Sequence, residues 1–282
     1  MRYIYTVARY FFFEQYRLRA KPNSAPLVYV DHEFDERVPF APERVSIYLD
    51  FIRIWVAAIS HARRELGRAS TDAIAAFIDG LSDSYLEAYR VYRRCASTTR
   101  RPTVAANGSF GLIYAVDPHL FCLPSLHVMI VSYTWLEIRR IYTALGEGER
   151  GRSAWEDLYR QAVSITDTVI YVKQHSVNCI PAALFMTTRM RSDFSRSDAL
   201  AFIDELFLEP ALPDRPSIVR YMRELYGRFM DEADRRALSE GSEAGDYGDV
   251  LVEFLLGYPR GAAVPQIDSH NAAPARSSSL EA

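Results

Sequence analysis

Apolar side chains recur at helical spacing along almost the whole of this 282-residue chain. The clearest stretch runs from Ser70 to Arg94, where large apolar or aromatic residues return every three or four positions and charged residues fill the other face. That spacing is typical of an amphipathic helix, because apolar residues in a strand alternate. The sequence has no strand alternation, no glycine-rich phosphate loop and no internal repeat. It therefore predicts an all-α fold.

Several residue patterns mark where these helices begin and end. Pro124 is expected to open a helix that ends at Gly146, because proline suits a first helical turn and glycine a helix end. Ser153 and Glu156 form a capping-box pattern, which predicts the start of another helix. Pro181 then starts or kinks the helix that follows. Helices are predicted over 45–66, 70–94, 124–146, 153–173, 197–208, 217–236 and 249–256.

The composition changes near the end of the chain. After Tyr258 the sequence is rich in Pro, Ala, Ser and Gly, so residues 259–282 are expected to be a disordered tail. Residues 239–248 are acidic and predict a mobile loop. Residues 1–258 are expected to form a single all-α domain. Its chemistry-bearing core spans 30–190, and the later helices are additions to it.

The amino-acid composition excludes several classes of protein. Apolar residues make up 49% of the chain and charged residues 24%, which fits a globular domain and excludes a disordered or collagen-like chain. A net charge of −3 gives no overall basic field for binding nucleic acid. The three cysteines, Cys95, Cys122 and Cys179, cannot all pair within one chain, which favours a reducing compartment.

No segment is convincing as a signal peptide or a transmembrane helix. The longest stretch without Asp, Glu, Lys or Arg, residues 118–136, contains two prolines and two histidines. The apolar segment 45–62 carries Asp50 and Arg53. The aromatic and basic N-terminus suits either a helix packed on the core or a helix lying on a membrane surface. The expected location is therefore cytoplasmic or peripheral to a membrane.

The first of three chemical clusters is a pair of arginines. Arg94 is followed, after six intervening residues, by Arg101 and Pro102. A guanidinium can donate two parallel hydrogen bonds to a phosphate-like anion, so the pair is a candidate oxyanion site. A solvated helix end rich in arginine explains the same pattern equally well.

The second cluster is Pro124-Ser125-Leu126-His127. The free amides and the positive dipole end at a helix N-terminus favour a bound anion. Ser125 would donate a hydrogen bond to a phosphoryl group there, and His127 would protonate a leaving oxygen. The alternative is an ordinary helix start with a packed histidine.

The third cluster is Tyr171-Val172-Lys173-Gln174-His175. A histidine can attack phosphorus as a nucleophile, and the nearby Lys173 would offset the charge that develops. The alternative is a core histidine whose hydrogen bonds are satisfied inside an apolar helix.

Taken together and in this order, the clusters resemble the signature of the type 2 phosphatidic acid phosphatase and vanadium haloperoxidase superfamily. That signature has a basic residue, six intervening residues and Arg-Pro, then Pro-Ser-Gly-His, then a His followed four positions later by Asp. The chain is most similar to the inositol phosphorylceramide synthase-like branch, which has Pro-Ser-Leu-His and a Tyr-x-Lys-Gln-His type motif. Residues 35–42 (DERVPFAP) with Tyr48 also resemble that branch's Asp-x-x-Ile-Pro-Phe-x-Pro pattern. The resemblance covers residues 30–190.

The resemblance implies a helical bundle of that superfamily's type and a role for each matching residue. The activity would be that of a phosphoric ester hydrolase or phosphotransferase, acting on a phosphate ester such as a lipid or isoprenoid phosphate. No metal would be required. His175 would be the nucleophile that forms a phosphohistidine, and His127 the general acid. The implied phosphate-binding residues are Arg94, Arg101, Ser125 and Lys173.

Two departures distinguish this chain from the family pattern. Cys179 stands where the family has the Asp that orients the nucleophilic histidine. A Cys179 thiolate, or the side chain of Asn178, is a candidate substitute. Charged residues also interrupt the helices that span the membrane in the branch relatives, which predicts a soluble or peripheral form of the fold.

Three alternatives follow from these departures. The first is a catalytically weakened descendant that binds an anion or a partner without turnover. The second is a zinc site, because His175 and Cys179 are four residues apart and Cys122 and His127 are five apart. The third is a haloperoxidase, in which vanadate would be a cofactor and not an inhibitor.

Overall fold

The computed structural model confirms the all-α prediction, because the described chain is 76% helical with two short strands. It describes residues 1–102, 108–208, 211–240 and 246–259. The predicted tail from residue 260 onward and the centre of the predicted acidic loop, residues 241–245, lie outside the described residues.

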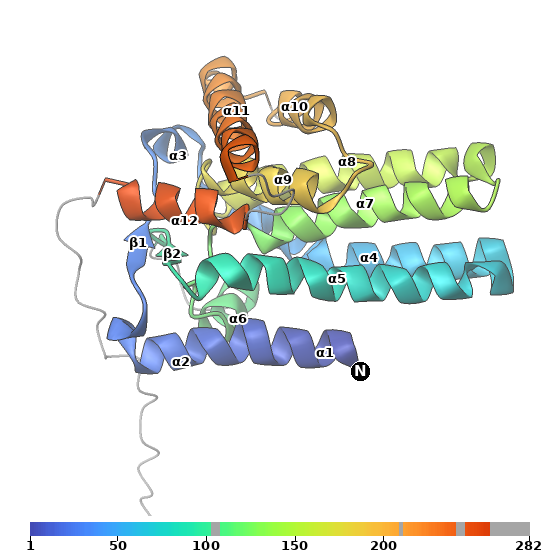
Figure 1. The fold of residues 1–282 in the computed structure, drawn as a ribbon, viewed down its shortest axis with the longest axis horizontal. Helices are drawn as coiled ribbons and strands as arrows, with labels where there is room; N and C mark the ends of the chain where they lie inside the picture. The colour runs from blue at the N-terminus through green and yellow to red at the C-terminus, as the bar shows by residue number, and fades with distance from the viewer. Residues whose placement is uncertain (103–107, 209–210, 241–245, 260–282) are drawn as a thin grey trace, which may run out of the picture.

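Five helices form the central bundle, with their axes roughly aligned (Figure 1). The third, α7, packs against the other four, and nearly all of its residues are buried. The bundle helices are α4 (Val45–Leu66), α5 (Thr71–Tyr92), α7 (Leu126–Ala144), α8 (Gly148–Tyr171) and α9 (Cys179–Met190).

Glycines allow two neighbouring helices to approach α7 closely. A Cβ at Gly151 of α8 would lie 2.3 Å from the Tyr142 ring, and one at Gly80 of α5 would meet the Tyr133 hydroxyl. A side chain at either position would push a bundle helix away from α7. These two contacts therefore help to fix the spacing of the bundle.

The N-terminal segment is one continuous helix that lies along α5 (Figure 1). It consists of α1 (Arg2–Thr6), the π-helical segment η1 (Val7–Phe13) and α2 (Glu14–Ala20). One face packs on the core through Thr6, Gln15 and Leu18. Several aromatic side chains on the other face are exposed. The N-terminal helix therefore packs on the core through one face, as one of the two expectations required, and leaves its other face exposed.

A two-stranded parallel sheet, which the sequence did not predict, holds the segments that lead into the candidate site. β1 (Leu27–Tyr29) pairs with β2 (Ala96–Thr98), and Ser97 of β2 also bridges to Phe121. Strands of three residues are too short to show alternation, which is why the pattern was missed. The sheet fixes the chain just before Arg101 and just before Ser125.

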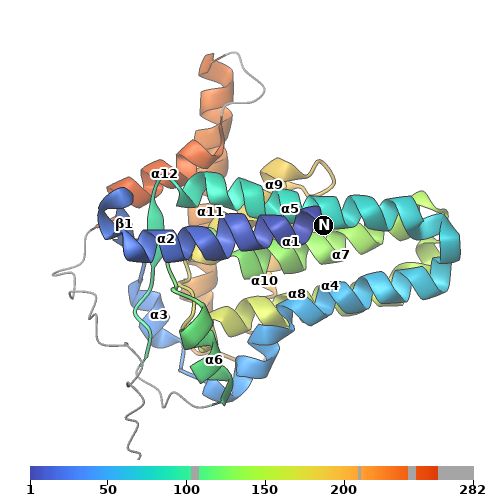
Figure 2. The same cartoon turned by 90° about the horizontal axis from the view of Figure 1, so that it is seen from below.

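Short helices complete the connections between these elements. α3 (Glu33–Arg37) follows β1, and α6 (Gly108–Val116) lies between β2 and α7. Figure 2 shows α6 beside α4 and the N-terminal helix. The single-turn helices are η2 (Pro22–Ser24), η3 (Pro42–Arg44) and η4 (Gly67–Ser70).

The additional C-terminal helices predicted from the sequence are present. They are α10 (Arg196–Asp204), α11 (Arg215–Glu240) and α12 (Gly248–Gly257). α11 stands across the bundle axis on the side opposite the N-terminal helix (Figure 1). α12 packs against α5 and α11.

Two predicted helix starts are wrong. Helix α7 begins at Leu126 with Ser125 as its N-cap, so Pro124 precedes the helix and is not in its first turn. Helix α8 begins at Gly148, so Ser153 lies inside it and does not cap it. By contrast, the range 45–66 matches α4.

One region is apolar enough to meet a membrane-span criterion. The range Pro42–Tyr92 contains a stretch with mean hydropathy 1.3, of which 22% is buried. A single such stretch is weak evidence for a span. It is compatible with a soluble or a peripheral protein.

Candidate active site

His175 lies in the loop between α8 and α9, and not on a helix. The amides of Gln174 and His175 both donate to the Val169 carbonyl at the end of α8. Asp35 of α3 holds the other side of the loop, because its carboxylate accepts from the Val177 amide at 2.7 Å. The loop is therefore fixed from both sides, and the imidazole is directed into the core.

Two hydrogen bonds determine the orientation and the tautomer of the His175 ring. Nδ1 lies 3.0 Å from the Cys122 carbonyl oxygen, and Nε2 lies 3.3 Å from Ser125 Oγ. A carbonyl only accepts, so Nδ1 carries the proton of the neutral ring and Nε2 keeps its lone pair. The Ser125 hydroxyl donates to that lone pair.

The protonation state of His175 suits a nucleophile or a base. Burial, together with a smaller effect of the positive charge of Arg101, lowers the pKa of His175 to about 4, although the hydrogen bond to the Cys122 carbonyl acts in the opposite direction. The imidazole is therefore neutral at neutral pH, with its Nε2 unprotonated. This is the form that can attack an electrophile.

His127 lies in the first turn of α7, beside His175. Their ring centroids are 5.5 Å apart. The rings of Tyr48 and Phe51 from α4 pack against His127, with centroids 4.2 and 4.1 Å away. Its Nε2 is buried without a hydrogen-bond partner among the described residues. Burial and the neighbouring His175 hold the pKa of His127 well below its usual value.

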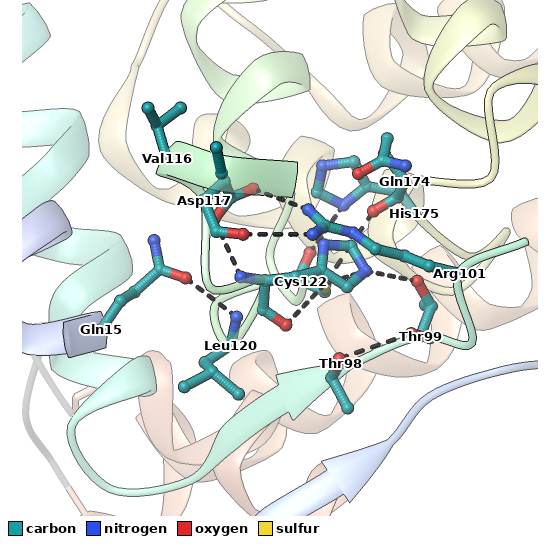
Figure 3. A network of polar contacts seen from close by, with 12 residues as sticks. Gln15, Thr98, Thr99, Arg101, Val116, Asp117, Leu120, Cys122, Gln174 and His175 are labelled. Carbon is teal, nitrogen blue, oxygen red and sulfur yellow. Dashed lines mark hydrogen bonds and ion pairs between the residues drawn. The ribbon is translucent and has the colours of Figure 1, made fainter. Parts of the chain in front are cut away.

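Arg101 is held by Asp117, at the end of α6 (Figure 3). Its guanidinium donates to the Asp117 backbone carbonyl at 3.1 Å and to the Asp117 carboxylate at 3.2 Å. The Tyr114 ring lies 4.6 Å beneath it. Its Nε is buried without a partner among the described residues, so one donor remains for a ligand.

A cavity of about 250 Å³ opens beside Arg101. Leu18, Arg19 and Pro22 line one side of this cavity, and Tyr114, Asp117 and Pro118 line the other. The charge of Arg101 also lowers the pKa of His175, so Arg101 is close to both the cavity and the histidine. An anion in this cavity would meet a guanidinium first.

A buried polar chain supports the loop that carries the Cys122 carbonyl (Figure 3). The Nε2 atom of His119 lies 2.8 Å from Thr99 Oγ1 and 3.5 Å from Cys122 Sγ. The Asp117 carboxylate accepts from the His119 amide at 2.9 Å. The same carboxylate therefore fixes Arg101 and the turn that leads to Cys122.

Two of the predicted phosphate-binding residues lie away from this group. Arg94 pairs with Asp249 and with Asp246, which ties the end of α5 to α12. The Lys173 ammonium donates to the backbone carbonyls of Asp35 and Val38, next to α3. Sequence proximity placed Lys173 beside His175, but its positive φ of 55° directs the side chain elsewhere.

The structure corrects the two predicted substitutes for the orienting carboxylate. Cys179 is fully buried, and burial raises the pKa of its thiol well above the usual value, so the thiol is neutral. The Asn178 amide is bonded to the Val30 carbonyl and to the hydroxyls of Tyr221 and Tyr258. Neither side chain supplies the group that holds His175, because the Cys122 carbonyl does so.

The geometry also differs from the one that the zinc alternative requires. His175 is in a loop and Cys179 begins α9, so they do not share a helical face. The Cys122 thiol faces His119, whereas its backbone oxygen contacts His175. Within the described ranges, no group of three or more His, Cys, Asp or Glu residues is placed to hold a metal ion.

Sequence reasoning missed several residues that shape the site. Asp35 and Tyr48 belong to the N-terminal pattern, so their positions were noted without a role. Phe51, Asp117 and His119 carried no sequence signal, because nothing in their spacing relates them to the three clusters.

No protein-family model, curated protein or solved structure matches this chain.

Proposed function

We propose that this chain is a phosphoric ester hydrolase or phosphotransferase that uses His175 as its nucleophile. One observation carries the proposal: the unprotonated Nε2 of a neutral His175 faces Ser125 at the N-terminus of α7. An anion at that helix end is stabilised by free amides and by the helix dipole. Arg101 and His127 supply two further unpartnered nitrogen atoms close by.

The proposed chemistry has two steps. Nε2 of His175 forms a bond to phosphorus as the bond from phosphorus to the leaving oxygen breaks, and His127 gives its proton to that oxygen. Water or an acceptor alcohol then attacks phosphorus and gives its proton to His127 as the P–N bond breaks. The Cys122 carbonyl stabilises the Nδ1–H of the positively charged phosphohistidine.

His127 must carry a proton to act as the acid in the first step. Burial and His175 keep its pKa low in the absence of an anion. A bound phosphate dianion within hydrogen-bond distance raises the pKa of an imidazole, because it favours the charged ring. Substrate binding would therefore favour the protonated form of His127, which can act as the acid.

A weakened or inactive descendant that binds an anion is the second candidate. Ser125 and Cys179 are fully buried and His175 is nearly so, which limits access to the nucleophile. The cavity beside Arg101 would still accept an anion without any reaction at His175. Both candidates fit a cytoplasmic or a peripheral membrane protein.

The test is phosphate release from a panel of phosphomonoesters and a lipid phosphate. Wild-type protein is expected to release phosphate, and His175→Ala to lose at least about a thousandfold in turnover, as expected when a nucleophile is removed. Vanadate is expected to inhibit. Arg101→Ala should raise KM more than Arg94→Ala does, because Arg94 is engaged by Asp249. Arg90→Ala, an exposed residue paired with Glu87, is the control.

The results separate the two candidates. Phosphate release that His175→Ala leaves intact would exclude the proposed nucleophile. No release from any substrate, with phosphate binding that depends on Arg101, would support the non-catalytic descendant. Calorimetric titration with inorganic phosphate measures that binding directly.

A further inference from the structure

Nine exposed apolar or aromatic side chains lie on three elements, which Figure 2 shows near one another. The elements are the N-terminal helix, α4 and α6. We call this set the N-terminal face. Its members are Ile4, Tyr5, Phe12, Phe13, Tyr16, Ile52, Val56, Leu112 and Val116, each at least 37% exposed.

Contacts between the three elements bring the residues of the N-terminal face onto neighbouring parts of the molecule. The Tyr3 and Trp55 rings are 5.3 Å apart and join the N-terminal helix to α4. The Tyr16 hydroxyl donates to the Val116 carbonyl at 2.9 Å and joins α2 to α6. α4 and α6 are also in contact. Exposed apolar patches of this kind mark interaction surfaces.

The charges on this face differ from those of the chain as a whole. The first 21 residues contain five cations and a single carboxylate, Glu14, whereas the whole chain has a net charge of −3. Glu14 is buried and pairs with Arg9 and Arg17. Arg19 and Lys21 are exposed, and neither forms an ion pair within the described ranges. The nine residues of α6 carry no charge at all.

The cavity beside Arg101 opens at the edge of this face. Arg19 and Pro22, at the end of the N-terminal helix, form one lip, and Tyr114 of α6 is opposite. A headgroup at the surface would therefore meet Arg19 at the rim and Arg101 inside.

We propose that the N-terminal face docks on an anionic lipid surface, with its aromatic and aliphatic side chains in the interface and Arg19 and Lys21 against the headgroups. A helix with aromatic residues on one face and arginines beside them is typical of interfacial binding. The two unpaired cations select for negative charge. This docking does not depend on the chemistry proposed for His175.

A second copy of the chain fits this face less well. A two-fold interface would place the same patch on both subunits. Arg19 and Lys21 would then meet another part of this face. The carboxylates on its three elements, Glu14, Asp50 and Glu65, are already paired with arginines. A lipid surface supplies the missing negative charge.

The test is flotation of full-length protein with vesicles. Binding is expected to vesicles of phosphatidylcholine with phosphatidylserine, and to be much weaker to vesicles of phosphatidylcholine alone. Phe13→Ser with Leu112→Ser should lower the partition coefficient at least about tenfold, because two exposed apolar groups no longer insert. Arg19→Gln with Lys21→Gln should lower it about fivefold for each cation removed, on the anionic vesicles only. Leu238→Ser is the matched control, an exposed leucine on α11 at the opposite side.

Several results would overturn the proposal. One is that the protein does not float with anionic vesicles. A second is that Leu238→Ser lowers the partition coefficient as much as Phe13→Ser with Leu112→Ser does. A third is that Phe13→Ser with Leu112→Ser leaves vesicle binding unchanged. Light scattering provides one more such result. If the wild-type protein is a dimer that binds no vesicles, and Phe13→Ser with Leu112→Ser makes it dissociate, the N-terminal face binds a second copy of the chain. Melting curves of each variant show whether a loss of binding reflects unfolding. Arg19→Gln with Lys21→Gln changes only solvated side chains, so it tests vesicle binding independently of the apolar substitutions.

Discussion

A main-chain oxygen holds the ring of His175. In serine hydrolases a carboxylate takes this position, orients the imidazole and stabilises its charged form. The Cys122 carbonyl supplies the orientation and the tautomer here, but it contributes only a dipole. A phosphohistidine at this position would therefore form more slowly than one backed by a carboxylate, without requiring a different mechanism.

This residue-scale arrangement predicts the outcome of Cys179→Asp. The new carboxylate would be fully buried, and Nδ1 of His175 is already bonded to Cys122. Turnover should not rise, and the free energy of unfolding should fall by several kcal/mol because an unpaired charge is buried. Phosphate release and thermal melting measure the two effects. Cys179→Ser, which is neutral and of similar size, is the control.

An increase in turnover with Cys179→Asp would contradict this prediction. It would show that the carboxylate displaces the Cys122 carbonyl and that a carboxylate at this position can orient His175. An unchanged melting temperature would show that the new charge finds a partner in the folded state.

Single residues also show how far sequence reasoning extends. The motifs predicted that Ser125, His127 and His175 would come together, and the geometry does bring them together. They could not predict the Cys122 carbonyl, because every residue has one and its direction depends on the folded loop. Nor could they show that Lys173 turns away, because a left-handed backbone conformation at lysine carries no sequence signal.

At the scale of elements, the short helix α3 controls the loop of His175. The two carboxylate oxygens of Asp35 accept from the Val177 amide and from the His32 amide, each at 2.7 Å. The Lys173 ammonium donates to the backbone carbonyl of Asp35. The N-terminal pattern is therefore a structural clamp on the candidate site, and α3 cannot shift without moving His175.

The clamp predicts a pH dependence of activity. Burial raises the pKa of Asp35 to about 6, so its carboxylate is charged above that value and accepts its two hydrogen bonds at full strength only there. Turnover should fall as pH drops through about 6, well above the pKa of His175. In Asp35→Asn the fall near pH 6 should disappear. That variant should also lose about 1–3 kcal/mol of stability, because one acceptor oxygen becomes a donor.

The kcat–pH profile and chemical denaturation test this prediction. Glu36→Gln, on the exposed side of α3, should change neither. An inflection near pH 6 that persists in Asp35→Asn would assign it to another group, with His127 in the presence of substrate as the next candidate.

How accurately the sequence predicts the bounds of a helix depends on the length of that helix and on the residues that it buries. The range 45–66 was correct because twenty-two residues of α4 repeat the helical pattern six times. The starts of α7 and α8 were wrong because proline and the capping-box pattern are local signals. In α7 the cap is Ser125, one residue after the proline, and α8 begins at Gly148, five residues before the capping-box serine.

At the scale of the whole molecule, a buried carboxylate joins the bundle to the C-terminal helices. Asp167 of α8 accepts from the Phe207 amide at 2.9 Å, just after α10. Burial raises its pKa to about 8, although the charges of Arg44 and Arg215 act in the opposite direction. The sequence could not reveal this, because an aspartate within an amphipathic helix is expected on the solvated face.

The raised pKa of Asp167 predicts a contribution to stability that is lost in alkaline solution. The folded state retains a proton on Asp167 up to about pH 8, whereas the unfolded chain loses it near pH 3.8. Between these values, each rise of one pH unit therefore lowers the contribution of Asp167 to stability, and the loss levels off above pH 8. That contribution should fall by about 2–3 kcal/mol between pH 6 and pH 9. Chemical denaturation of wild type and Asp167→Asn across this range measures it as the difference between the two proteins.

Asp167→Asn keeps an acceptor for the Phe207 amide and removes the titrating group. Its stability should match wild type near pH 6 and exceed it at pH 9, so the difference between the two proteins should grow with pH and level off above pH 8. The buried histidines His119, His127 and His175 have lowered pKa values, so they add stability as pH rises through 6.5. They do so equally in both proteins and cancel from the difference. Asp157→Asn, an exposed residue on the same helix, is the control. A difference that stays constant from pH 6 to pH 9 would show that Asp167 is ionised in the folded state, with Arg44 and Arg215 outweighing its burial.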